Sequence, residues 1–478
     1  MPAAGGAASG ARGWRQGFRP VGHRTLGRVL KIHVVRPDGH LYYLGELTPD
    51  RDGPVLAAGE SPGRWSGAGA EALGMSGAVD APGFGEVLDG RHPGTGRDLR
   101  ARSTTRGVSG YDLTFCAPKS VSLLHLLAPG EIAGQVGAGH DAAVGEVLSY
   151  LQRTALAVRR RTRDGGRQLL PTTGAVSASF VHRTSRDLDP HLHTHLVVAN
   201  LAHGVDGRWS AVDSRRIFAH ARSAQGIYHA RLRMELRDRI GAAWDVPANG
   251  LGDVVGVDRT LRRLFSQRTA AIDRYVADRA GRPGGPRRLD VAAHATRPDK
   301  DRTRTLESLR AEWAGRAAEF GFDLGDLTRV VGRAPAGPES RVFDGDRVGQ
   351  RLDELASARR SLARRDVVAV LADAAPGGIG AGMLEAVADR VLASAGETVP
   401  GSGSGRGSTR PAVGSGVREP RWPADGVARV LDREPAVLLA GVIDRRATVP
   451  PAPGRGPRIG RGRHVRAERG ISAPGLDR

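Results

Sequence analysis

The stretch Phe180–Leu201, which reads FVHRTSRDLDPHLHTHLVVANL, decides the fold. It holds four of the chain's fifteen histidines, at positions 182, 191, 193 and 195. The last three alternate with Leu192 and Thr194 and lead into an apolar run, a pattern typical of a β-strand whose successive side chains point to opposite faces. We therefore expect His193 and His195 to project side by side from one face.

His182 lies at the end of another short run, residues 177–182. The segment between the two runs, TSRDLDP, is rich in turn-forming residues, so the runs are predicted to pair as a hairpin that brings His182 across from the other histidines. Three neutral imidazoles that converge on one point form a divalent metal site, here His182, His193 and His195. Because a catalytic metal keeps a coordination position open, we interpret His191 as peripheral, in contact with a phosphate.

The composition of the 478-residue chain indicates a polyanionic partner. The formal net charge is +20, almost all of it from arginine, since Lys31, Lys119 and Lys300 are the only lysines. Nucleic acid is the usual partner of such a chain, although a GC-rich genome also favours solvated arginine. Cys116 is the only cysteine, which excludes a disulfide framework and a cysteine metal site and fits a cytoplasmic protein.

Several functional classes are excluded by the motifs that the sequence lacks. No stretch reaches the roughly 18 apolar residues of a membrane span, and the N-terminus has no apolar signal core, so neither membrane insertion nor secretion is expected. No lysine lies in a P-loop motif, so no nucleotide is expected to bind at a Walker site.

Alternating and helical periodicities predict a mixed α/β chain. Strands are expected over residues 29–35 and 111–115 and in the histidine hairpin, followed by a short pairing at 207–212. Helices are expected from about residue 120 and over 132–161, 215–238, 258–280, 305–320, 353–371 and 383–393. The basic run Arg159-Arg160-Arg161 falls at the end of the long helix over 132–161 and is a candidate for phosphate contacts.

Tyr42 and Tyr43 form an adjacent pair just after the first predicted strand, in a chain with only six tyrosines. A tyrosine hydroxyl can attack a phosphodiester if a metal polarises the phosphate. The alternative is that both rings pack against the end of the strand.

Asp112 lies in the predicted strand of GYDLTFCAPKSVSLL. A carboxylate there can accept a hydrogen bond from a metal-ligating histidine and fix its tautomer, or act as general base toward the tyrosine. A surface salt bridge is the alternative. Lys119, in the same motif, is either a phosphate contact or merely exposed.

These motifs, in the order YY, GRWSGAGAEALGMSGAVD, GYDLTFCAPKSVSLL and FVHRTSRDLDPHLHTHLVVANL, resemble the relaxase domain of the MobF (TrwC-like) conjugative relaxases. These relaxases belong to the HUH endonucleases, named for a histidine-hydrophobic-histidine motif, which here is His193-Thr194-His195. The resemblance runs from about residue 29 to residue 320.

The resemblance implies an α+β fold with a central antiparallel sheet flanked by helices and a helical region that clamps single-stranded DNA. Tyr42 would nick one strand at an origin of transfer and stay on its 5′ end. The three histidines would hold a divalent metal, Mg²⁺ or Mn²⁺ with Zn²⁺ also suitable, and Asp112 would have the carboxylate role described above. Origin DNA would be the main partner, with a type IV secretion coupling protein and a separate helicase as further partners.

The sequence departs from the family pattern in three ways. Relatives carry a second tyrosine about seven residues beyond the first, whereas TPDRDGPVLAAGESPGRW has none. Relatives are often fused to a helicase, and this chain lacks a working one, so we predict a relaxase domain at 29–330 and a helical remnant resembling the start of a helicase region at 331–400. The third departure is a basic stretch, 1–28, predicted to be disordered, as are the Gly-, Ser-, Pro- and Arg-rich residues 401–478.

Two other functions use the same motifs. A rolling-circle replication initiator of the HUH type would share the chemistry but cleave a replication origin. A degenerate relaxase would bind DNA without cutting it.

Overall fold

The computed structural model describes residues 30–37, 39, 43, 49–50, 53–54, 62–100, 107–245, 252–278, 291, 295–296, 304–334, 343–358, 361–397 and 421–423. The predicted N-terminal tail, Tyr42 and the glycine-serine linker at 401–416 lie outside the described residues. Within them, no helix is long and apolar enough to cross a membrane.

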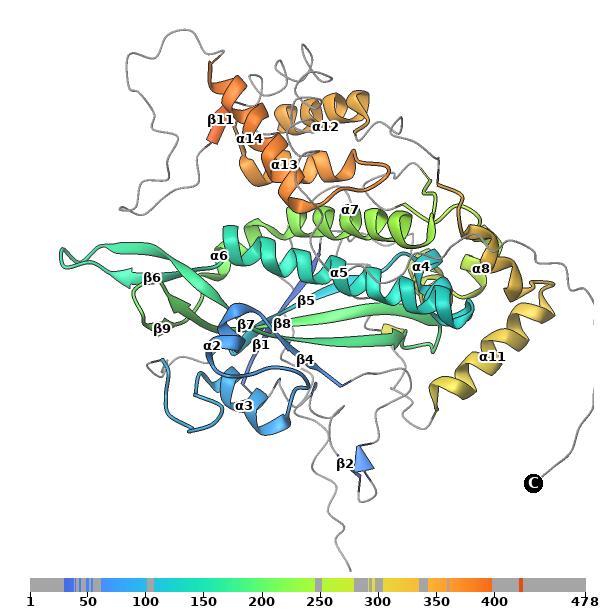
Figure 1. Cartoon of the computed structure of the whole chain (residues 1–478), viewed down its shortest axis with the longest axis horizontal. Helices are drawn as coiled ribbons and strands as arrows, with labels where there is room; N and C mark the ends of the chain where they lie inside the picture. Colours follow the sequence, from blue (N-terminus) through green and yellow to red (C-terminus); the bar gives the residue numbers. More distant parts are fainter. Residues whose placement is uncertain are drawn as a thin grey trace, which may run out of the picture.

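A seven-stranded antiparallel sheet forms the centre of the protein (Figure 1), which confirms the predicted fold class. The strands run in the order β1-β5-β8-β7-β4, with β6 paired to β7 and β9 paired to β8. Their bounds are β1 Lys31–Val35, β4 Arg64–Ser66, β5 Gly110–Cys116, β6 Ala157–Arg161, β7 Arg167–Thr184, β8 Pro190–Gly204 and β9 Trp209–Ser210. Two further pairs are small: β2 Pro49–Asp50 with β3 Gly53–Pro54, and β10 Ser361–Ala363 with β11 Arg421–Pro423.

The predicted histidine hairpin is confirmed as the pair β7 and β8, with His182 directly opposite His193. In the first half of β8, buried residues alternate with half-buried ones. The buried residues are Leu192, Thr194 and Leu196. They share one face of the sheet, because successive side chains of a strand point to opposite faces. The histidines therefore share the other face.

Helices cover both faces of the sheet and enclose two hydrophobic cores. Above the sheet in Figure 1 lie α4 Lys119–Leu127, α5 Gly130–Thr154, α6 Ser214–Ala219 and α7 Ala221–Ile240. Below it lie α2 Ala68–Ala72 and α3 Ala81–Asp89. The second core, on the α2 and α3 side, contains Tyr43, Phe84 and Phe180. Beside the hairpin turn lie α8 Arg259–Leu264, α9 Gln267–Ala277, α11 Leu306–Glu319 and the 3-10 helix η2 Leu324–Val330.

The long helix predicted over 132–161 is wrong in its last seven residues. Helix α5 ends at Thr154, and Arg159 to Arg161 belong to strand β6. The carbonyls of Thr154 and Ala155 accept hydrogen bonds from the guanidinium of Arg216, which satisfies the end of the helix. After it, Ala157 to Arg161 pair with the first residues of β7. The apolar spacing continues across this break, so the helical period did not reveal it.

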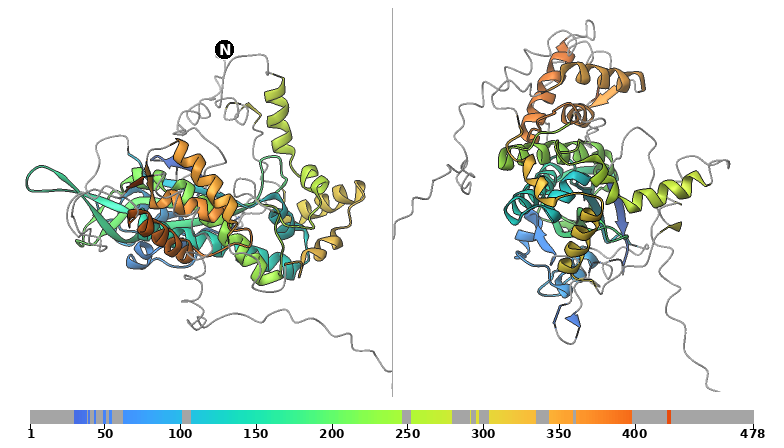
Figure 2. Two further views of the ribbon diagram at one scale, coloured as in Figure 1. Left: turned by 90° about the horizontal axis from the view of Figure 1, so that it is seen from above. Right: turned by 90° about the vertical axis from the view of Figure 1, so that its right-hand side faces the viewer.

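Three C-terminal helices lie above α7 in Figure 1, and α13 is the one that packs against α7 while the other two pack against α13 (Figures 1 and 2). They are α12 Gly345–Ala358, α13 Arg364–Asp373 and α14 Ala381–Glu397. Arg233 of α7 is only 1% exposed, and its guanidinium donates to the carbonyls of Ala372 (2.8 Å) and Ala375 (3.1 Å) at the end of α13. Gly226 permits the close approach, since a Cβ there would lie 2.9 Å from the Cβ of Ala372.

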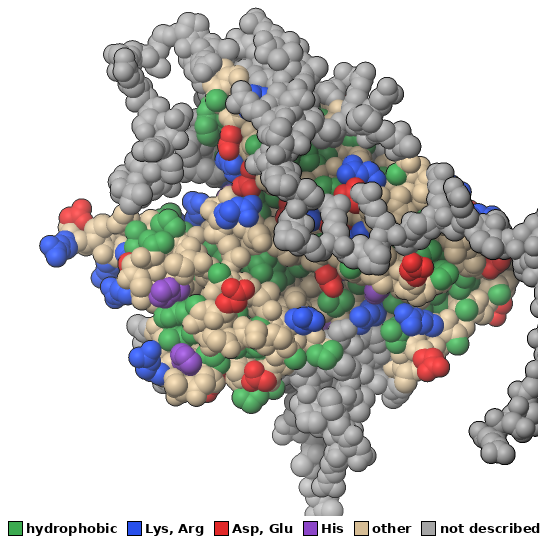
Figure 3. Space-filling view, viewed as in Figure 1, with side chains coloured by type: hydrophobic (Ala, Val, Ile, Leu, Met, Phe, Trp, Pro, Cys, Tyr) green, Lys and Arg blue, Asp and Glu red, His purple; other side chains and the backbone are tan. Residues whose placement is uncertain are grey.

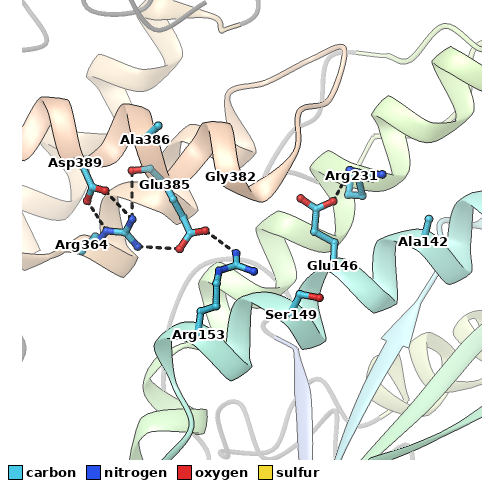
Figure 4. A pocket seen from close by; sticks show the side chains of 10 residues that line it. All are labelled: Ala142, Glu146, Ser149, Arg153, Arg231, Arg364, Gly382, Glu385, Ala386 and Asp389. Carbon is cyan, nitrogen blue, oxygen red and sulfur yellow. Dashed lines mark hydrogen bonds and ion pairs between the residues drawn. The ribbon is translucent and has the colours of Figure 1, made fainter. Parts of the chain in front are cut away.

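A polar groove marks the seam between these helices and α5 (Figure 4). Arg153 of α5 pairs with Glu385 of α14 at 2.7 Å, and Arg364 of α13 pairs with both Glu385 and Asp389. The apolar side chains beneath this seam belong to the same core as the sheet. Helices α12 to α14 therefore share the core of the predicted relaxase domain; their resemblance to the start of a helicase region stays a prediction.

We expect a chain ending after Ala334 to be strongly destabilised, because it would expose the apolar face of α7 and leave the guanidinium of Arg233 without its carbonyl acceptors. The melting temperature should fall by more than about 10 °C. A chain ending after Pro423 keeps every described contact and is the control. Equal melting temperatures for the two shortened chains would contradict the shared core.

Candidate metal centre and tyrosine site

Three histidines converge on the face of the sheet that carries α2 and α3. His182 comes from β7, and His193 and His195 come from β8. One ligand nitrogen of each lies within 4.8 Å of the other two. An ion that takes nitrogen ligands at about 2.1 Å fits between them if each ring moves inward by less than about 1 Å. The residues present therefore fit a divalent metal.

Two of these imidazoles are held through their Nδ1 atoms. His195 Nδ1 lies 2.8 Å from Asp112 Oδ2, and His193 Nδ1 donates to the carbonyl of His191 at 3.0 Å. In each ring this leaves Nε2 as the atom that can bind a metal. Burial, reinforced by the neighbouring histidines, lowers the pKa of His193 well below its usual 6.5. The ring is therefore neutral at pH 7, as a metal ligand must be.

Asp112 is buried behind the histidines, at 3% exposure, and is not part of a surface salt bridge. Its Oδ2 atom accepts a hydrogen bond from the Tyr43 hydroxyl at 2.8 Å as well as the bond from His195. Burial alone would raise the pKa of this carboxyl group, but the charge of His195 and the hydrogen bonds from His195 and Tyr43 hold the pKa below its ordinary value. Asp112 therefore stays ionised and can fix the tautomer of His195.

Tyr43 is the second residue of the tyrosine pair, and its side chain is 2% exposed. Its ring centroid lies 5.3 Å from that of Phe180 and 6.2 Å from that of Phe84. Tyr43 thus packs in the core, as the alternative interpretation of the pair predicted, while its hydroxyl reaches Asp112. A catalytic role for Tyr43, which we predicted together with those of Tyr42 and Asp112, stays a prediction.

His191 lies on the metal-binding face, whereas Lys119 begins α4 on the other side of the sheet, and neither residue belongs to the triad. The ring of His191 lies 4.7 Å from the ring of His193. Lys119 is half-buried rather than exposed, and its Nζ donates to the carbonyl of Pro190 at 2.6 Å. Burial lowers the pKa of Lys119 to about 8, with Asp189 acting in the opposite direction. Contacts of either residue with a phosphate stay predictions.

Arg159, Arg160 and Arg161 lie far from the histidines. Strand β6 pairs with the start of β7, where Arg159 is opposite Leu169. His182 is near the other end of β7, roughly 40 Å away at about 3.3 Å per residue. Arg159 pairs with Asp213 (3.2 Å) and Arg160 with Asp206 (2.6 Å). Any DNA contact made by these arginines is separate from the metal centre.

The sequence analysis missed two histidines that support the site. His33 of β1 is directly opposite Asp112, a pairing that depends on strand register. His140 of α5 is buried behind β8, with Nε2 2.7 Å from the Thr194 hydroxyl and Nδ1 2.8 Å from the Tyr228 hydroxyl. The alternating pattern around His33 could have placed this histidine on a strand, whereas no sequence motif marks His140.

Comparisons with known proteins agree with this geometry. A family model described as TrwC relaxase matches residues 38–320. The multifunctional conjugation protein TraI of Escherichia coli is 34% identical over 307 residues, which cover 62% of this chain but 16% of TraI. The solved metal-free structure of the conjugative relaxase TrwC with oriT DNA is 32% identical, with a TM-score of 0.53, and the match covers 62% of this chain and 99% of that one. The metal-bound TrwC structure with oriT DNA gives the same identity and coverage and a TM-score of 0.54.

We expect Tyr43→Phe to weaken metal binding by about tenfold, because the Oδ2 atom of Asp112 would lose one of the two donors that hold it behind His195. The phenylalanine ring keeps the packing against Phe180, so the chain should remain folded. Calorimetric titration with Mn²⁺ measures the effect. An unchanged dissociation constant would show that the Tyr43 hydroxyl does not support the centre.

The burial of His140 predicts a pH dependence of stability. Burial lowers its pKa to about 3, whereas the pKa of histidine in an unfolded chain is about 6.5. The unfolded chain therefore binds more protons between these values, so stability is present above about pH 6.5 and is lost as the pH falls. His140→Gln should reduce the loss of unfolding free energy between pH 7 and pH 5 by about 2 kcal/mol in urea titrations. An equal loss in both proteins would contradict the buried neutral state.

Proposed function

The chain belongs to the TrwC relaxase family, and on that premise we propose that it nicks one DNA strand at a plasmid origin of transfer and holds the cut strand as a covalent 5′-phosphotyrosine. The observation that carries this proposal is the convergence of His182, His193 and His195 beside the buried pair Asp112 and Tyr43. The described TrwC structures contain oriT DNA, in metal-free and metal-bound forms, which supports the same substrate class here.

The three histidines would hold a divalent ion, with Mg²⁺ or Mn²⁺ preferred at a phosphate site and Zn²⁺ also compatible with imidazole ligands. When bound, the ion would stabilise negative charge on the oxygens of the scissile phosphate. Asp112 and the carbonyl of His191 hold Nδ1 of His195 and His193, so both rings present Nε2 toward the ion and need only a small inward movement to bind it. The site is thus organised before DNA arrives.

Tyr42 is the nucleophile in this proposal. Its oxygen would form a bond to phosphorus as the bond from phosphorus to the 3′ oxygen breaks, which releases a 3′ hydroxyl and leaves the 5′ phosphate on the protein. The reverse attack by a 3′ hydroxyl would rejoin the strand. Because Oδ2 of Asp112 already accepts two hydrogen bonds, we assign Asp112 to the orientation of His195 rather than to removal of the tyrosine proton.

The hairpin of β6 and β7 is proposed as a second DNA contact. It projects beyond the body of the protein (Figure 2), and Figure 3 shows basic side chains along it. Arg161, Arg163 and Arg167 are exposed, and Arg161 is directly opposite Arg167. Like charges in this position repel each other, so a phosphate between them would be stabilising. A two-stranded ribbon also fits the major groove of duplex DNA.

Further partners follow from the same proposal. The curated relative is named a multifunctional conjugation protein, and this chain matches 16% of its length. A helicase supplied by another chain and a coupling protein of a type IV secretion system would complete transfer of the nicked strand.

The chain incubated with Mn²⁺ and a library of single-stranded plasmid DNA should form an adduct that survives denaturation. Mass spectrometry should place the nucleotide on Tyr42, and both Tyr42→Phe and chelation of the metal should abolish the adduct. An adduct that persists in Tyr42→Phe would refute the nucleophile. Binding of DNA without any adduct in the wild-type chain would favour the degenerate relaxase that only binds.

Replacing Arg161, Arg163 and Arg167 together with glutamine should weaken binding to duplex plasmid DNA and reduce the slope of log affinity against log salt by about 2 to 3, because up to three phosphate contacts are lost. Arg329→Gln, which changes an exposed arginine in η2, is the control. An unchanged salt slope in the triple variant would show that the hairpin does not contact DNA.

A further inference from the structure

A buried carboxylate joins the turn of the histidine hairpin to the helices that follow the sheet. Asp189, which is 1% exposed, immediately precedes β8. It accepts hydrogen bonds from the backbone nitrogen of Gln267 (2.7 Å), from the side-chain Nε2 of Gln267 (2.8 Å) and from the guanidinium of Arg316 (3.3 Å). Gln267 is the first residue of α9, and Arg316 lies in α11. We call these three residues the Asp189 junction.

Two further hydrogen bonds fix the same turn. The indole nitrogen of Trp313, a buried residue of α11, donates to the carbonyl of Leu188 at 2.8 Å. Lys119 of α4 donates to the carbonyl of Pro190. Leu188 has a φ of 55°, which leucine rarely adopts. Such a backbone persists only where its surroundings hold it. Here the turn's own bonds, from the Leu188 nitrogen to the Ser185 carbonyl (3.1 Å) and from the Ser185 nitrogen to the Asp189 carbonyl (2.9 Å), act together with the contacts from α4 and α11.

The Asp189 junction is close to the metal ligands along the chain. His193 follows Asp189 by four residues, about 13 Å along an extended strand. Between them, the backbone nitrogen of Leu192 donates to the hydroxyl oxygen of Ser122 at 3.1 Å, and the carbonyl of Leu192 accepts a hydrogen bond from the Ala117 nitrogen at 3.0 Å. Asp189 and His193 are therefore joined by a hydrogen-bonded strand segment, with no flexible loop between them.

We propose that Asp189 is a positioning residue that couples α9 and α11 to the metal centre. Whatever moves these two helices, such as DNA bound against them, would change the position of His193 through the junction. Because coupling between two sites is reciprocal, metal binding to the histidines must in turn order α9 and α11. This inference rests on the metal centre of the proposed function.

The test uses hydrogen exchange and metal titration of the full chain without DNA. In the wild-type chain, Mn²⁺ should slow amide exchange in peptides from α11. Asp189→Asn keeps the size of the side chain but points an amide group toward donors, so it should raise the dissociation constant for Mn²⁺ by about tenfold and abolish the metal-dependent slowing in α11. A purely structural role would lower the melting temperature without affecting either property.

Two variants keep the inference falsifiable if Asp189→Asn fails to fold. Arg316→Met removes one donor from α11 and leaves the hairpin sequence intact, so it should weaken Mn²⁺ binding in the same direction. Asp206→Asn removes a paired carboxylate near the other end of β8 and is the matched control, with Mn²⁺ binding expected to match the wild type.

The outcomes separate the two proposals. A wild-type chain that does not bind Mn²⁺ would overturn the metal centre and, with it, the coupling. If the wild-type chain binds Mn²⁺ and a folded Asp189→Asn or Arg316→Met variant binds it equally well, the coupling alone is overturned. The same follows if the wild-type chain binds Mn²⁺ but amide exchange in α11 does not change when the metal is added.

Discussion

One buried carboxylate oxygen, Oδ2 of Asp112, is the point on which the site depends. It is bonded to a histidine of the metal triad and to the hydroxyl of Tyr43, so it joins strands β5 and β8 to the tyrosine pair. A buried carboxylate without partners is strongly unfavourable, and removal of either donor leaves charge uncompensated. The need to satisfy Asp112 therefore holds Tyr43 against the metal-binding face while the hydrophobic rings around Tyr43 fill the core.

Because side chains alternate between the two faces of β8, the metal ligands and the residues that pack against the helices lie on opposite sides of the strand. On β8 the histidines face one side. Leu192, Thr194 and Leu196 face the layer of α4 to α7, where the Thr194 hydroxyl is hydrogen-bonded to the buried His140. The same strand therefore packs in the hydrophobic core with one face and carries the metal ligands on the other. A shift of register by one residue would exchange the two sets, so the packing of the helices also preserves the positions of the ligands.

Local patterns predicted the hairpin, because alternation and turn residues are close together in sequence, whereas the central antiparallel sheet was implied by the family resemblance. The end of α5 was mispredicted because apolar spacing continues into β6, where pairing with β7 decides the structure. The partners of Asp189, at positions 267 and 316, are distant in sequence and have no motif, so only the folded chain reveals them. Tyr42 lies outside the described residues, and its role rests on the family resemblance and the site that surrounds Tyr43.

Anomalous diffraction from crystals grown with Mn²⁺ tests the central claim most directly. The account predicts one anomalous peak bound by the Nε2 atoms of His193 and His195 and by one ring nitrogen of His182. Asp112 should stay outside the coordination shell, bonded to Nδ1 of His195. A peak elsewhere, or a metal bound directly by the carboxylate of Asp112, would contradict the account.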